Sequence, residues 1–168
     1  MFTDELRKSL EEYLSKNYVE SREDMADYTL DSDVTKSAGA TFTKKETFTL
    51  DQLMEEVGES FHDMLFLRID MSGMTDVEVY KRANIDRKLF SKIRSNPAYH
   101  PRKQTVLALA IALKLSIDDT IDLLARAEYA LSPGNKGDLI VKYFIERGVY
   151  DIMTINFALD EYGQSILE

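Results

Sequence analysis

Basic side chains gather in one stretch of this otherwise acidic chain. Residues 75–114 contain nine basic and three acidic residues, a net charge of +6, whereas the other 128 residues contain 12 basic and 27 acidic ones, a net charge of −15. Clustered Lys and Arg side chains are typical of surfaces that bind phosphates. The residues whose types suit such contacts are Arg87, Lys88, Ser91, Lys92, Arg94, Arg102 and Lys103.

Two short helices with a tight connection position most of these side chains. Thr75 followed by Glu78 is a capping box, which predicts the start of a helix over 76–83. The turn 84–86 begins with an asparagine, which tolerates positive φ, and ends with an aspartate, a good N-cap for a second helix over 87–95. Two helices of about two turns each, joined by three residues, indicate a helix-turn-helix.

Apolar residues at helical spacing predict an all-α protein around this unit. The N-terminal arm, residues 1–48, contains one helix and a polar stretch that is best interpreted as an extended linker. A helical core over 50–131 and a C-terminal helical pair over 132–168 follow. The further helices are expected over 4–17, 51–71, 101–113, 117–130, 136–147 and 151–162.

The stretch from Thr75 to Ile93 aligns without gaps with the pattern of the Xre family, and the chain resembles this family, whose relatives include Cro and the lambda repressor. Thr75 stands at the family's N-cap and Asn84 at its turn glycine. Phe90, Ser91 and Ile93 stand at its Ile-Ser-x-Ile signature. Residues 101–123 resemble the family's fourth and fifth helices, so the resemblance covers about residues 60–131. It implies a lambda-repressor-like helical core and a DNA-binding regulator of transcription that reads double-stranded DNA with helix 87–95.

The resemblance also implies roles for the basic residues. Those on the exposed side of helix 87–95 would meet base edges or phosphates, namely Arg87, Lys88, Ser91 and Lys92. Arg94, Arg102 and Lys103 would contact backbone phosphates.

Three positions depart from the family pattern. Asp76 replaces a polar residue that touches a phosphate, and Arg94 replaces a glutamate. Tyr80 replaces an alanine at which the two helices pack closely, so the tyrosine must separate them or point outward. These departures keep a second interpretation open, a helix-turn-helix-derived module for protein–protein interaction or an adaptor without DNA binding. A third is autoinhibition, with residues 18–48 shielding the basic face.

Other chemistry finds little support. The absence of cysteine excludes disulfides, thiolate metal sites and cysteine nucleophiles. His62 lies between Glu59 and Asp63, but this trio is more typical of a solvated helix face than of a metal site. We expect no cofactor, no metal and no enzymatic activity. With no signal peptide and no apolar run of membrane length, we also expect a cytoplasmic protein with no membrane association.

The C-terminal pair is richer in large apolar residues than a small helix pair needs. We expect these residues to pack on the core and on the N-terminal arm. A homodimer or partner interface formed by the C-terminal helices is the alternative. The residues are Tyr143, Phe144, Tyr150, Ile152, Met153, Ile155 and Phe157.

Overall fold

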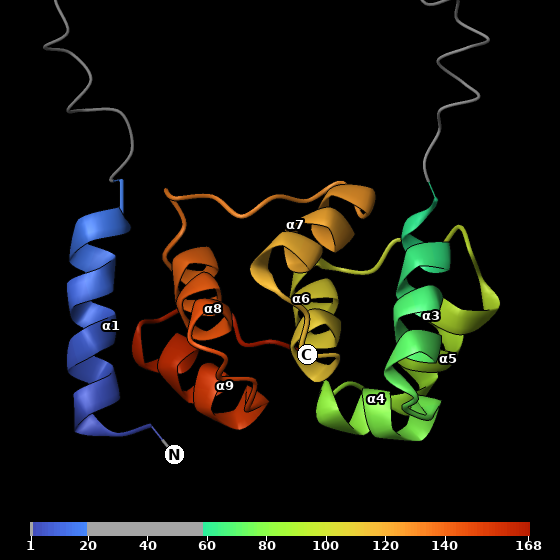
Figure 1. The fold of residues 1–168 in the computed structure, drawn as a ribbon, viewed down its shortest axis with the longest axis horizontal. Coiled ribbons are helices and arrows are strands. Elements are labelled where there is room, and N and C mark those ends of the chain that lie inside the picture. The colour runs from blue at the N-terminus through green and yellow to red at the C-terminus, as the bar shows by residue number, and fades with distance from the viewer. Residues whose placement is uncertain (1, 20–58) are drawn as a thin grey trace, which may run out of the picture. The chain divides into compact units, whose positions relative to one another are not determined.

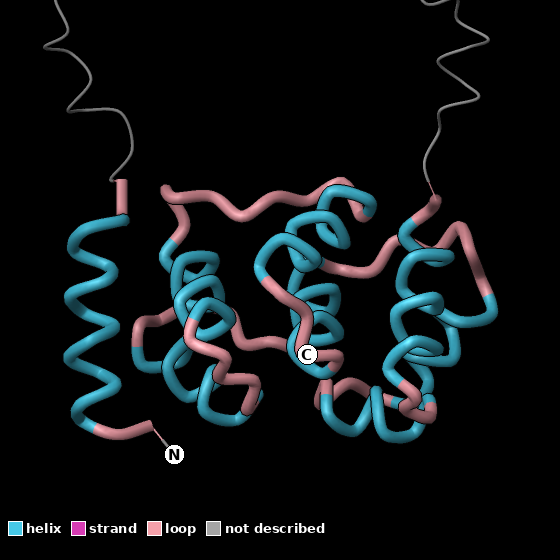
Figure 2. The backbone as a smooth tube through the Cα atoms, in the orientation of Figure 1, coloured by secondary structure: helices cyan, strands magenta, loops and turns pink. Residues whose placement is uncertain are grey.

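The computed structural model describes residues 2–19 and 59–168, and every regular element in these ranges is an α-helix, with no strand (Figures 1 and 2). The predicted all-α class is confirmed for this part of the chain. The predicted linker and the first part of the helix over 51–71 lie outside the described residues. The helices are α1 (Asp4–Asn17), α3 (Phe61–Ser72), α4 (Asp76–Arg82), α5 (Arg87–Ser95), α6 (Lys103–Ala112), α7 (Ile117–Arg126), α8 (Lys136–Glu146) and α9 (Ile152–Glu161).

Local side-chain chemistry sets the boundaries of α4 and α5 as predicted. Thr75 Oγ1 accepts from the Glu78 backbone N–H, and Glu78 Oε2 accepts from the Thr75 N–H at 2.8 Å, which completes the capping box. Asn84 has φ 54°, the left-handed conformation expected at the turn. Asp86 Oδ1 accepts from the Lys88 N–H at 2.7 Å and so caps α5.

Two predicted helices, over 101–113 and 117–130, are shorter in the structure by three residues or more. The helix expected to reach residue 130 ends at Arg126, because Glu128 adopts φ 60° and the Tyr129 N–H closes on a carbonyl five residues back (2.8 Å). The helix expected over 101–113 starts later, because Arg102 has an extended backbone and acts as its N-cap.

The centre of the core is α6. Every residue from Thr105 to Leu113 is buried, so this helix has no polar face. Its neighbours α4, α7 and α9 each pack on it, and α8 packs on α7 and α9. The apolar side chains of these helices form one continuous core.

The C-terminal pair packs as predicted, and α1 covers it, lying alongside α8 (Figure 1). Tyr143 and Phe144 are fully buried, and the ring of Tyr13 meets Tyr143 edge-on at 5.2 Å. Tyr13 also donates to Glu146 at 3.1 Å, and burial together with this carboxylate raises the pKa of Tyr13 to about 12. Met153 and Phe157 remain exposed on α9.

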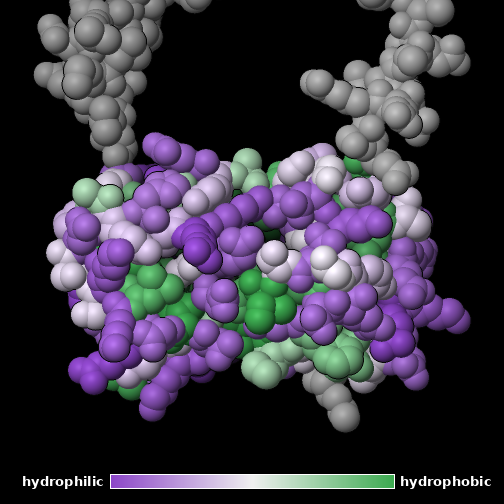
Figure 3. Space-filling view, turned by 180° about the vertical axis from the view of Figure 1, so that it is seen from behind, coloured by the Kyte–Doolittle hydropathy of each residue, from purple (hydrophilic) through white to green (hydrophobic). Residues whose placement is uncertain are grey.

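On the face seen in Figure 3, polar side chains predominate and apolar ones emerge in separate patches. None of the described helices has the length and apolar character that crossing a membrane requires. The large apolar residues that stay exposed are Val19, Leu67, Met71, Val77, Ile121, Met153, Phe157 and Ile166. Ile121 of α7 is exposed, whereas Leu123 and Leu124 on the same helix are buried.

The residues that follow α9 are held against the core by a buried amide. Asn156 accepts from the Leu167 N–H at 2.8 Å and donates to the Leu167 carbonyl at 3.0 Å. Thr105, on α6, donates to the Glu168 backbone carbonyl at 2.8 Å. These bonds hold Leu167 in the core, where it is buried, and keep the residues next to it against α6.

We predict that Asn156→Ala lowers the free energy of unfolding by about 2 kcal/mol, because two buried backbone groups lose their partners. Urea denaturation measures the loss, and amide exchange at Leu167 should accelerate. Asn17→Ala, which removes one exposed hydrogen bond at the end of α1, is the control and should change little. Unchanged exchange at Leu167 would contradict the role assigned to Asn156.

Candidate nucleic-acid interface

The two sides of α5 differ in chemistry. One side places Phe90 and Ile93 in the core, and the opposite side faces solvent. The four predicted contact residues on this helix, Arg87, Lys88, Ser91 and Lys92, are all exposed. Among the described residues, no acidic side chain pairs with Arg87 or Lys88, so both charges are available to an anionic partner.

A second group of side chains extends this surface toward the start of α6. The Lys92 ammonium lies over the ring of Tyr99, 4.4 Å from its centre. This cation–π contact holds Lys92 beside the loop that leads to Arg102. Arg102 is exposed and has no paired acid in the described part of the chain. The basic face is defined here as Arg87, Lys88, Ser91, Lys92 and Arg102.

Arg94 forms an ion pair with an acidic residue of the neighbouring helix α4. Its guanidinium makes a two-pronged ion pair with Asp76, with both N–O distances at 2.5 Å, and lies 4.3 Å from the centre of the Phe66 ring. The hydrogen bonds to Asp76 raise the pKa of Arg94 above its ordinary value. His62 adds a contact to the Arg94 backbone carbonyl at 3.0 Å. Arg94 therefore links α4 and α5.

Lys103 was also expected to contact a phosphate, and the structure gives it another role. Its ammonium lies 2.6 Å from the carboxylate of Asp138, a side chain only 7% exposed. The same carboxylate accepts from the Ser132 N–H at 2.8 Å. Lys103 thus ties the start of α6 to the start of α8.

Tyr80 leaves α4 and α5 in contact. Its ring is half-buried and lies 5.9 Å from that of Phe90, centre to centre. Together with Val77, which is 46% exposed, it lines a groove of about 420 Å³ between the two helices. Asp76, Arg87, Ser91 and Arg94 complete the lining. The ring of Tyr80 thus packs partly against the core and borders the groove.

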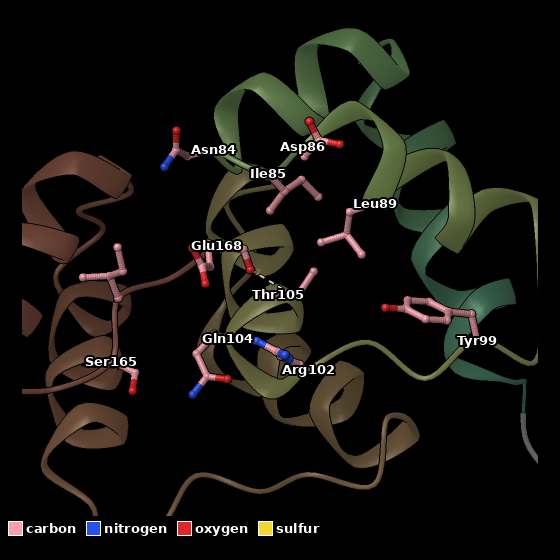
Figure 4. Close-up of a pocket in the computed structure, with 11 residues that line it drawn as sticks. Asn84, Ile85, Asp86, Leu89, Tyr99, Arg102, Gln104, Thr105, Ser165 and Glu168 are labelled. Carbon is pink, nitrogen blue, oxygen red and sulfur yellow. Dashed lines mark hydrogen bonds between the residues drawn. The ribbon is translucent and has the colours of Figure 1, made fainter.

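A larger pocket of about 840 Å³ adjoins the basic face (Figure 4). One wall comes from the turn 84–86, from Leu89 of α5, and from Tyr99, Arg102, Gln104 and Thr105 around the start of α6. The opposite wall comes from the segment after α9, through Ser165, Ile166 and Glu168. Sequence reasoning missed this pocket. Its two walls are about eighty residues apart in the chain, and no local pattern marks residues 165–168 as a wall.

No family model, no curated protein and no solved structure matches this chain. What the surface can bind is therefore inferred from its own charges and shape.

We predict that Lys103→Met lowers the free energy of unfolding by about 3 kcal/mol, because it leaves the Asp138 carboxylate buried without its cation. Urea denaturation of the double variant K103M/D138L should recover a large part of that loss, since both charges are then gone. Lys88→Met, on the exposed side of α5, is the control. Losses that simply add in the double variant would contradict a coupled pair.

Proposed function

We propose that the protein is a DNA-binding regulator of transcription that docks α5 on double-stranded DNA, with an Xre-like, lambda-repressor-like arrangement of α3 to α7. The observation that carries this proposal is the basic face. It gathers unpaired cations on the solvent side of one helix, in a protein whose net charge is −9. Phosphates are the partners that such a surface attracts most strongly.

The local geometry of α4 and α5 supports the docking mode. A capped helix of seven residues, a turn with Asn84 in the left-handed region and a capped helix of nine residues suit a recognition unit whose second helix enters the major groove. On this proposal Arg87, Lys88 and Ser91 lie nearest the base edges. Arg102 contacts the phosphate backbone.

The two internal ion pairs change the expected strength of binding. Arg94 and Lys103 are held by Asp76 and Asp138, so fewer cations meet the phosphates than the sequence contains. Neutralisation of about three phosphates gives a slope of roughly −3 for the logarithm of affinity against the logarithm of salt concentration.

We predict that R87Q/K88Q weakens binding to a random duplex at least tenfold and makes the salt slope shallower by about 2. A random duplex offers no specific base sequence, so both cations are expected to neutralise phosphates there. Fluorescence anisotropy at several salt concentrations measures both quantities. K8Q/K136Q removes the same charge from exposed positions outside 75–114 and should leave the slope unchanged. If the unaltered protein bound no duplex at any salt concentration, DNA binding would be ruled out.

We predict that Asp76→Asn strengthens duplex binding about threefold, because the anion at the start of α4 disappears and Arg94 becomes available to a phosphate. The same anisotropy titration measures the gain. Asp118→Asn removes an exposed acid in the first turn of α7 and is the matched control. Weaker binding by a D76N protein with an unchanged melting temperature would contradict this placement of Asp76 beside the DNA.

A protein–protein interaction module is the second candidate, and one observation favours it. The groove between α4 and α5 exposes Val77 and part of Tyr80 against Phe90, which suits an apolar side chain of a partner protein. The salt titration separates the two candidates. A DNA-binding protein loses affinity for duplex steeply as salt rises, whereas a module without DNA binding shows no duplex affinity to lose.

A further inference from the structure

A second group of cations surrounds a separate groove. This groove, of about 510 Å³, is lined by the ends of α4 and α6 and by the connection between α8 and α9. Lys81, Arg82 and Lys114 line it, together with Ile111, Tyr150 and Asp151. None of the predicted DNA contacts belongs to this set. The three cations and their hollow are called the basic groove below.

The cations of the basic groove form no direct ion pair. Among the described residues, no acidic side chain lies within ion-pair distance of Lys81, Arg82 or Lys114, and all three side chains are exposed. Glu78 lies one turn before Arg82 on α4, and hydrogen bonds from Thr75 together with the charge of Arg82 lower the pKa of its carboxyl. The Arg82 guanidinium lies 3.2 Å from the sulfur of Met74. The acid in the lining is Asp151, and its carboxylate accepts from the backbone and hydroxyl of Thr154 as the N-cap of α9. The groove therefore presents net positive charge.

The backbone at Lys114 adds an independent observation. This residue has φ 53°, at the position after α6 where a helix commonly ends on glycine. A lysine in the left-handed region is conformationally disfavoured relative to glycine. The Lys114 backbone N–H donates to the Ile111 carbonyl at 3.0 Å. The turn is therefore held by backbone atoms and does not need the lysine side chain. What lysine adds here is its ammonium at the edge of the groove.

We propose that the basic groove binds a compact phosphorylated anion. Three cationic residues from two helix ends line a hollow large enough for a small ligand. Charge-assisted hydrogen bonds to phosphate oxygens are the interactions that such donors make best. Tyr150 is held in the wall by its hydroxyl, which donates to the Leu115 carbonyl at 2.9 Å, so the site is preformed on that side. The proposal is independent of DNA binding by the basic face.

The test is a calorimetric titration of the full chain with pyrophosphate at constant ionic strength. We expect saturable binding of one pyrophosphate, and Lys114→Gly should weaken it about tenfold through loss of one charge-assisted contact. Glycine suits φ 53°, so the K114G protein should melt no lower than the unaltered one. Glu128→Gly is the matched control, because Glu128 occupies the equivalent left-handed position after α7 with the opposite charge, away from the groove.

Arg82→Gln provides a second variant and should weaken pyrophosphate binding by a similar factor. R87Q/K88Q should leave it unchanged, which separates this site from the basic face. The proposal is overturned if the unaltered protein shows no saturable binding, or if K114G and E128G bind equally well. It is also overturned if K114G weakens duplex binding while pyrophosphate does not bind, because the cations then belong to a DNA backbone contact.

Discussion

The need to cover α6 on every side governs the arrangement of the other helices. A helix that is apolar all round cannot lie at a surface, so its neighbours must surround it. Residues 105–113 are all buried, and α4, α7 and α9 supply the cover. Only the two ends of α6 reach solvent, at Arg102 and Lys114. Both candidate sites lie at these ends, because the ends are where the buried helix meets polar surface.

Ion pairs between distant segments then orient the elements that the core brings together. Asp76 and Arg94 link α4 to α5, the helix that carries most of the basic face, and Lys103 and Asp138 link the starts of α6 and α8. In the sequence, Asp76 and Arg94 are two separate departures from a family pattern. In the structure they are one interaction, in which a carboxylate on α4 holds a guanidinium that shares its helix with the basic face. A buried or two-pronged pair of this kind sets geometry more than it adds stability.

How much could be predicted from the sequence depends on the range of each interaction. The capping box at Thr75, the left-handed Asn84 and the cap at Asp86 act within four residues, and all three were correctly predicted. The end of α7 was predicted too late in the chain, because Glu128 takes the left-handed position at which glycine is usually found. Both ion pairs were missed, since their partners are 18 and 35 residues apart and no local pattern connects them.

Counting cations along a stretch of sequence overstates the number of free positive charges on any one surface of the folded protein. The surplus of +6 over residues 75–114 suggests a single phosphate-binding face. The structure removes Arg94 and Lys103 from that count by pairing them internally. It then divides the remaining cations between the basic face and the basic groove, which share no lining residue. Each counterion released from DNA requires a cation that reaches a phosphate. On the proposed docking through α5, the salt dependence therefore comes from the basic face. The basic groove keeps a separate set of positive charges. A smaller anion is the partner that those charges suit.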